Sequence, residues 1–388
     1  MTYDTTRREF LSAGLALPIA GLTSKLGLVR SDSPSGEIPS SPQLSYRTLG
    51  KTGLKVTSVG FGCMVTSDPS VITRAADLGI TYFDTARVYQ HGNNEKMVGA
   101  ALKRKRKDII LSTKSPSEDK GSALNDLDTS LKELGTDYVD IWYLHAKTLP
   151  SDVPDELIEA QQIAKKAGKI RFAGVSTHSG QKQLLPWMAE KGTFDVVLVA
   201  YNFTMDPGME QAIEAAAQAN LGVVAMKVMA GGFKSLKHGD PAFEKLHREG
   251  AMLSALKWTL RNPHIGTTIP SMTDMDQLDE NLKAMSEPFG GADERLLADK
   301  LDIIKPLYCR LCGDCEGTCA KGLQVQDTLR FLTYAEGYGQ FALGREHFQA
   351  LPVIQKNTRC GDCEECTVKC PHGVHVAARM ARAQELFA

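Results

Sequence analysis

Eight cysteines near the end of the chain have the residue type and spacing of a metal site. They form two blocks with the pattern C-x-x-C-x-x-C-x-x-x-C, and the offset between the blocks is the same at all four positions: Cys309, Cys312, Cys315 and Cys319, then Cys360, Cys363, Cys366 and Cys370. Three thiolates two residues apart can bind three corners of an iron–sulfur cube, and the fourth corner needs a more distant sulfur. The pattern therefore predicts two 4Fe-4S clusters.

A second set of reactive side chains lies at the ends of predicted strands. Asp84 ends one strand and Tyr89 follows in the loop, whereas Lys114 and His145 end the next two strands. A tyrosine hydroxyl has a pKa of about 10, and a nearby ammonium favours the phenolate, so the phenol gives up its proton more readily. A carboxylate can hold that ammonium, and a histidine can donate a hydrogen bond to a carbonyl oxygen. Together these groups predict a site that delivers a proton to a carbonyl that accepts a hydride.

The elements that must position these residues alternate between strand and helix. After a predicted hairpin at 45–57, helical stretches separate eight apolar, strand-like runs: 57–62, 81–86, 108–114, 139–145, 170–177, 195–202, 222–228 and 266–271. Continuous apolar strands indicate a parallel sheet covered on both faces. Eight such units predict an α/β fold, the (β/α)8 TIM barrel, whose strand ends meet at one catalytic face. The alternative is a doubly wound nucleotide-binding sheet, but "GFG" at 60–62 lacks the third glycine of the phosphate-binding fingerprint.

The motifs "YFDTARVY", "NNEKMVG", "LSTK", "DIWYLH" and "GVST" resemble the aldo-keto reductases across residues 44–285. The resemblance implies the (β/α)8 fold and a tetrad of Asp84, Tyr89, Lys114 and His145 used with NADP(H). Tyr89 would act as general acid in reduction and as base in oxidation. Lys114 would tune it with support from Asp84, and His145 would orient the carbonyl.

The resemblance also marks positions that would bind the coenzyme: Ser176, Thr177, Lys227, Ser271, Glu280 and Asn281. Several departures make NADP(H) uncertain. Leu198 replaces the usual glutamine of the sixth strand, and Met226 replaces the aromatic residue that stacks on the nicotinamide. No Lys or Arg stands where the family grips the 2′-phosphate, and a phosphate without a fixed cation loses strong charge-assisted hydrogen bonds.

The cysteine blocks resemble bacterial two-cluster ferredoxins, and Pro371 follows Cys370 as in those proteins. There, the fourth ligand of each cluster comes from the other block. The resemblance implies two crossed quartets: Cys309, Cys312, Cys315 with Cys370, and Cys360, Cys363, Cys366 with Cys319. Forty residues that read mainly as helix separate the blocks, so uncrossed ligation stays open, as do zinc and disulfides. The remaining Cys63, on the first strand, is predicted to be a small buried apolar residue.

The N-terminal segment reads as an export signal. Arg7 and Arg8 precede an apolar stretch too short for a comfortable membrane span, and the segment resembles the twin-arginine consensus. We therefore expect a protein exported to the periplasm, either cleaved or anchored there. Net charge is close to zero, so nothing favours nucleic acid. The predicted domains are a signal (1–30), a Ser- and Pro-rich linker (31–42), the barrel (43–290) and a mainly helical ferredoxin-type 4Fe-4S domain (295–388).

Three functions fit these features. The first is an iron–sulfur oxidoreductase acting on carbonyl or alcohol groups, of sugars or small aldehydes, with an external electron carrier as partner. The second is a conventional NADP(H)-dependent carbonyl reductase with structural clusters. The third is a non-catalytic electron-transfer protein on a barrel scaffold. Clusters transfer single electrons and nicotinamides transfer hydrides, so coenzyme titration separates the first two.

Overall fold

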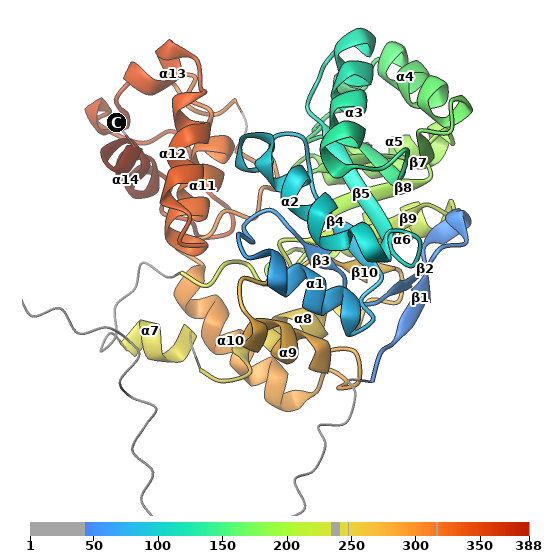
Figure 1. Ribbon diagram of the computed structural model, residues 1–388. Coiled ribbons are helices and arrows are strands. Elements are labelled where there is room, and N and C mark those ends of the chain that lie inside the picture. Colours follow the sequence, from blue (N-terminus) through green and yellow to red (C-terminus); the bar gives the residue numbers. More distant parts are fainter. Residues whose placement is uncertain (1–42, 234–240, 247, 316, 388) are drawn as a thin grey trace, which may run out of the picture. The chain divides into compact units, whose positions relative to one another are not determined.

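The computed structural model describes residues 43–233, 241–246, 248–315 and 317–387. Within these residues, eight parallel strands pair in the order in which they occur along the chain (Figure 1). They are β3 (Phe61–Gly62), β4 (Tyr82–Asp84), β5 (Ile110–Ser115), β6 (Val139–Leu144), β7 (Ile170–Thr177), β8 (Val196–Ala200), β9 (Gly222–Met226) and β10 (Thr267–Thr268). A parallel bridge from Val59 to Thr268 joins the two ends of the sheet. The sheet closes, and the predicted (β/α)8 barrel is confirmed.

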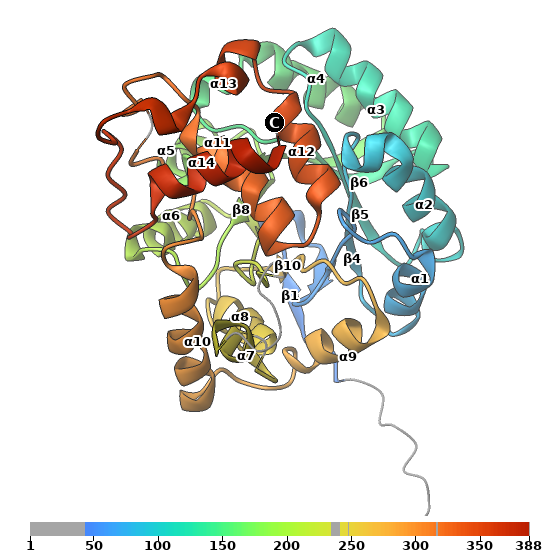
Figure 2. The ribbon, with the colours of Figure 1, turned by 90° about the vertical axis from the view of Figure 1, so that its left-hand side faces the viewer.

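Helices follow the strands in turn and surround them (Figure 2). They are α1 (Pro69–Asp77), α2 (Asn93–Leu102), α3 (Lys120–Leu134), α4 (Asp155–Lys166), α5 (Gln181–Lys191), α6 (Pro207–Gln218), α8 (Ala251–Leu260) and α9 (Met275–Lys283). Local sequence sets their ends: the Asp119 carboxylate caps the start of α3, and Gly135 ends it in the left-handed conformation. Their apolar faces form the main core with the outer faces of the strands.

The hairpin closes the end of the barrel opposite to the site. Strands β1 (Tyr46–Thr48) and β2 (Lys55–Thr57) pair antiparallel, as predicted. Leu49, beside the turn, is fully buried in the core inside the barrel, where it lies against Gly222 at the start of β9. Polar residues at the other ends of the strands therefore remain available for chemistry.

The C-terminal region is helical, as predicted. Helix α10 (Gly291–Ile304) packs against α8 and the short α7 (Pro241–Leu246). Beyond it the chain forms α11 (Val325–Leu332), a π-helical turn (Thr333–Gly337), α12 (Phe341–Gln349), α13 (Val353–Asn357) and α14 (Val376–Phe387). The predicted domain boundary at 290–295 falls at the start of α10, which contacts the barrel helices, and it stays a prediction.

The predicted signal and linker lie outside the described residues. Among the helices that the structure does describe, none is both long enough and apolar enough to cross a membrane.

Candidate active site and cysteine pockets

The ammonium of Lys114 lies at the centre of the four side chains predicted from the strand ends. It donates hydrogen bonds to the Asp84 carboxylate, to the Thr85 carbonyl at 2.7 Å and to the Tyr89 hydroxyl at 3.2 Å. The other carboxylate oxygen of Asp84 accepts a hydrogen bond from Ser112 at 2.7 Å. Lys114 and Asp84 are almost completely buried. Three of the predicted residues thus form one hydrogen-bonded chain.

The fourth predicted residue, His145, lies beside this chain. Its ring stands edge-on to the Tyr89 ring with 6.0 Å between centroids. Burial, followed by the positive charges of Lys114 and Arg330, holds the pKa of His145 well below its usual value. The imidazole is therefore neutral at pH 7 and keeps one N–H that can donate a hydrogen bond.

Burial also has the largest effect on the pKa of the Tyr89 phenol. Removal from water raises the pKa of Tyr89 to about 12, although the Lys114 ammonium acts in the opposite direction. This net shift is opposite to the one expected from the ammonium alone. At Lys114, burial acts in the other direction and would lower the pKa. The Asp84 carboxylate and the Tyr89 hydroxyl outweigh burial and raise that pKa. Near neutral pH, the site therefore contains a protonated phenol and a charged ammonium.

Strained backbone accompanies these residues at the rim of the barrel. Gln90 and His91 follow Tyr89 with φ of 51° and 54°, and Ala146 follows His145 with φ of 56°. Lys227, directly after β9, has φ of 57°. Non-glycine residues seldom adopt this left-handed conformation, and such strain is concentrated at functional sites.

The positions expected to bind a coenzyme are engaged in other contacts. Ser176 Oγ accepts a hydrogen bond from the Ala146 N–H at 2.9 Å, and the Thr177 hydroxyl donates to the Ser179 carbonyl. Leu198 and Met226 belong to the apolar core inside the barrel. Both hydroxyl groups are therefore already engaged with neighbouring backbone groups.

The coenzyme positions predicted after β10 also lie among residues that contact one another. Gln277, close to Ser271 in sequence, exchanges hydrogen bonds with Thr273 and donates to the Asp274 carboxylate. A carboxylate at this corner would repel a 2′-phosphate. Burial raises the pKa of Glu280. Asn281 is buried in α9. The described residues therefore do not fit NADP(H) in the way the family resemblance implies.

The C-terminal region adds side chains to the site that sequence reasoning missed. Lys227 Nζ lies 4.9 Å from the centroid of the Tyr334 ring and 5.7 Å from that of Tyr338. Gly232, in the loop after β9, donates its N–H to the Gly337 carbonyl at 2.9 Å. The segment "VQDTLRFLTYAEG" predicts only a helix, and no spacing in it signals contact with the barrel.

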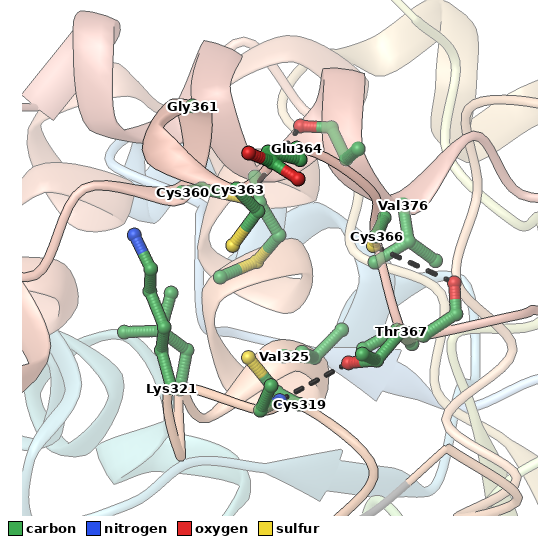
Figure 3. A pocket seen from close by; sticks show the side chains of 15 residues that line it. Cys319, Lys321, Val325, Cys360, Gly361, Cys363, Glu364, Cys366, Thr367 and Val376 are labelled. Atoms are coloured by element: carbon green, nitrogen blue, oxygen red, sulfur yellow. Dashed lines mark hydrogen bonds between the residues drawn. The ribbon is translucent and has the colours of Figure 1, made fainter.

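The cysteines line two separate pockets. Cys309, Cys312, Cys315 and Cys370 line one pocket, and Cys319, Cys360, Cys363 and Cys366 line the other. Figure 3 shows the labelled cysteines of the second pocket around a common space. Within each group the thiols are electrostatic neighbours. Burial, followed by Cys315, Cys312 and Cys370, raises the pKa of Cys309, and burial, followed by Cys366, Cys319 and Cys363, raises that of Cys360. The grouping corresponds to the crossed quartets.

Apolar side chains pack against most of the cysteines. Leu323, Val325, Val374, Val376 and Met380 form one buried cluster with Cys315 and lie against Cys309, Cys319, Cys360, Cys366 and Cys370, whereas Cys363 is exposed. None of the cysteines in the described residues forms a disulfide. Cys63 is fully buried in the barrel core, as predicted.

A smaller mixed group bears on the zinc alternative. Cys312, Asp314 and His372 bring their ligand atoms within 4.8 Å of one another. His372 is already engaged, because its two ring nitrogens lie 3.0 Å from Arg310 and 3.1 Å from Asp314. Four thiols around each of two pockets match cluster chemistry better than this group matches zinc.

Comparison with known proteins covers the barrel. A sequence model of the Aldo/keto reductase family matches residues 67–293. An uncharacterized oxidoreductase of Bacillus subtilis (strain 168) is 28% identical over 279 residues, covering 61% of this chain and 90% of that protein. L-galactose dehydrogenase of Arabidopsis thaliana is 28% identical over 308 residues, covering 68% and 96%. The holo form of an aldo-keto reductase from Bacillus halodurans is 26% identical, with coverage of 66% and 96% and a TM-score of 0.58.

Proposed function

The chain belongs to the aldo/keto reductase family of oxidoreductases, and from this premise we propose that it is an iron–sulfur enzyme that interconverts carbonyl and alcohol groups. The observation that carries the proposal is the hydrogen-bonded chain from Asp84 through Lys114 to Tyr89. These hydrogen bonds place an ionisable phenol next to a fixed ammonium at the catalytic face of the barrel.

In carbonyl reduction, Tyr89 donates its proton to the substrate oxygen as negative charge develops there. The Lys114 ammonium stabilises the phenolate that remains, and Asp84 keeps the ammonium charged and in place. The neutral His145 donates a hydrogen bond to the same oxygen and fixes the orientation of the carbonyl. In alcohol oxidation the phenolate accepts the proton back. The reduction also consumes two electrons, which the reduced external carrier would supply, and a second proton at carbon, which would come from solvent; only the proton at oxygen is assigned to these side chains.

The two cysteine quartets fit 4Fe-4S clusters. Cys309, Cys312, Cys315 and Cys370 would hold one cluster, and Cys319, Cys360, Cys363 and Cys366 the other. Two observations support this, since each quartet lines its own pocket and apolar side chains pack against six of the eight cysteines. When bound, such clusters supply one-electron transfer.

The family coenzyme fits less well. With Leu198 and Met226 inside the barrel core and Lys227 against two tail tyrosines, we derive no step through a nicotinamide. A conventional NADP(H)-dependent reductase with structural clusters remains the second candidate, favoured by the family match alone. The hydrogen-bonded carboxylate, ammonium and phenol at the catalytic face do not favour a non-catalytic electron carrier.

The proposed substrates are small carbonyl or alcohol compounds. Similarity to L-galactose dehydrogenase supports a sugar among them, and an external carrier would exchange electrons with the clusters. Export by the twin-arginine route belongs to the same proposal. It is supported only by Arg7, Arg8 and the apolar stretch that follows them.

The replacement Tyr89→Phe tests the proposal. The full chain is purified without oxygen, its iron and sulfide are measured, and turnover of aldehydes and alcohols is assayed with a viologen dye as electron carrier. Loss of the proton donor should lower the rate by about 10²- to 10⁴-fold. The matched control Tyr46→Phe changes a tyrosine on the hairpin that is 53% exposed, and it should keep full activity.

Two outcomes would contradict the proposal. A protein that turns over only with freely exchanging NADPH is the conventional reductase. A Tyr89→Phe variant as active as the control shows that the phenol is not the proton donor.

A further inference from the structure

A group of cationic and imidazole side chains lies where the C-terminal region meets the barrel. Lys227 contributes from the loop after β9, His178 from the loop after β7 and Arg330 from α11. His178 adjoins the active site, because its ring centroid is 6.2 Å from that of His145. Burial, then the charges of Lys227 and Arg330, holds the pKa of His178 well below its usual value. The three residues therefore share one electrostatic environment with the catalytic face.

The positive charges of this group are poorly balanced. The Asp84 carboxylate forms a salt bridge with Lys114 and balances its charge. In the described parts of the chain, by contrast, no Asp or Glu oxygen lies within 4.0 Å of the Lys227 ammonium. Arg330 has one carboxylate partner, Asp327, at 2.6 Å, and the Asp327 side chain is 46% exposed. An enclosed excess of positive charge costs free energy until an anion neutralises it.

Two hydrogen-bonding atoms of the same group lack partners. Arg330 Nε and His178 Nδ1 are both shielded from solvent, and neither has a hydrogen-bond partner within the described residues. Buried polar atoms in native proteins are nearly always paired, so each such atom calls for an explanation. A guanidinium N–H and an imidazole nitrogen are both suited to the oxygens of a carboxylate or phosphate.

The fold holds Lys227 firmly at this position. Its left-handed backbone is fixed by Asn202, whose amide donates to the Lys227 carbonyl at 3.0 Å and lies 3.2 Å from the Tyr308 hydroxyl. Tyr334, against the Lys227 ammonium, comes from a π-helical turn, a feature frequent at functional sites. The C-terminal region and the barrel thus build this corner together.

We propose that Lys227, Arg330 and His178 form a binding site for an anionic group, a carboxylate or phosphate, on the substrate whose carbonyl is reduced at Tyr89. Binding of an anion is independent of the reaction, whereas its assignment to the substrate rests on the proposed function. The same chemistry could come from the phosphates of a nucleotide, and the two sources are separated by experiment.

Calorimetric titration of the cluster-loaded full chain with inorganic phosphate tests the site. We expect one phosphate per chain, with Kd raised about tenfold or more in Lys227→Met and in Arg330→Gln, since each loses a charge-assisted hydrogen bond. Arg330→Lys should restore part of the affinity. Lys132→Met, at an exposed position on α3, is the matched control and should bind like the parent.

A matched pair of aldehydes tests the assignment to the substrate. Succinic semialdehyde carries a carboxylate that butanal lacks, and its kcat/KM should be at least about tenfold higher. Lys227→Met should bring the ratio of the two kcat/KM values down to about one, whereas Lys132→Met should keep the ratio of the parent. In the binding arm, succinic semialdehyde should displace phosphate, and NADP⁺ should not.

The outcomes separate the claims. Absence of phosphate binding, or binding equal in Lys227→Met and Lys132→Met, overturns the site. Displacement of phosphate by NADP⁺ alone overturns its assignment to the substrate. Phosphate binding that responds to Lys227 and Arg330 in a protein that turns over no carbonyl supports the site and refutes the proposed function instead.

Discussion

The ammonium of Lys114 has a hydrogen-bond acceptor for each of its three protons: a carboxylate, a backbone carbonyl and the Tyr89 phenol. A lysine held in this way cannot rotate away from the phenol without breaking buried hydrogen bonds, and each such loss costs about 1–3 kcal/mol. The phenol, which lies in the loop after β4, is therefore held in place by a lysine from β5 and a carboxylate from β4.

The protonation states of the site predict the pH dependence of carbonyl reduction. Tyr89, with its pKa raised to about 12, stays protonated, and His145, with its pKa far below 6.5, stays neutral. We expect kcat/KM for reduction, measured with the viologen dye, to be flat from about pH 6.5 to about pH 9. A change in kcat/KM with an apparent pKa near that of free histidine would show that His145 titrates within this pH range.

At this scale the sequence predicts which side chains meet at the rim of the barrel but not their energetics. Asp84, Lys114 and His145 could be found because strand ends converge in a barrel. The direction of the pKa shift of Tyr89 could not, because it depends on how deeply the ring is buried by residues remote in sequence. Arg330 and Tyr334 carry no spacing signal, since α11 reads as an ordinary amphipathic helix.

At the scale of elements, the two cysteine loops and the helices between them form one unit. Apolar residues from α11 and α14 pack with both blocks, so the blocks approach each other although forty residues separate them. The strand and helix pattern of the barrel was predictable because each strand is a short apolar run. The grouping of the cysteines needed a resemblance, since spacing alone allows crossed and uncrossed quartets.

Double replacements distinguish crossed from uncrossed ligation. If the quartets are crossed, Cys309→Ala with Cys370→Ala damages a single cluster and leaves about half of the iron, because both ligands serve the same cube. Cys360→Ala with Cys370→Ala damages both. Iron analysis and electron paramagnetic resonance of the reduced proteins measure this. The reverse order of iron contents would establish uncrossed ligation, and iron-free parent protein would remove the clusters altogether.

At the scale of the whole molecule, the neutral His347 lies where positive charges from the C-terminal region and the barrel meet. His347, on α12, stacks on Phe331 with ring centroids 5.2 Å apart. Burial, followed by the charges of Arg330 and Lys227, lowers the pKa of His347 to about 4. Protonating this imidazole would add a further charge beside two existing cations. The assembly of the two parts should therefore weaken in acid.

The sign of this effect follows from linkage. The unfolded chain protonates His347 below about pH 6.5, whereas the folded chain does so only near pH 4, so stability falls as the pH drops between these values. At pH 5 the loss from His347 is about 2 kcal/mol relative to pH 7. His347→Phe keeps the aromatic stacking without the titration, and the decrease in Tm from pH 7 to pH 5 should be smaller than in the parent.

His264→Phe provides the comparison, since His264 is an exposed histidine on the barrel. Its Tm should respond to acid as the parent does. Equal decreases in Tm for both variants would show that His347 is already protonated or unimportant at this contact.

The left-handed residues at the rim bear on how heat-resistant this enzyme can become. Ala146 and Lys227 each hold a conformation that costs a non-glycine residue about 1–2 kcal/mol. Glycine at Ala146 would relieve that cost and would also loosen the chain beside the His145 imidazole. At this rim, engineering for durability and engineering for speed lead to opposite choices.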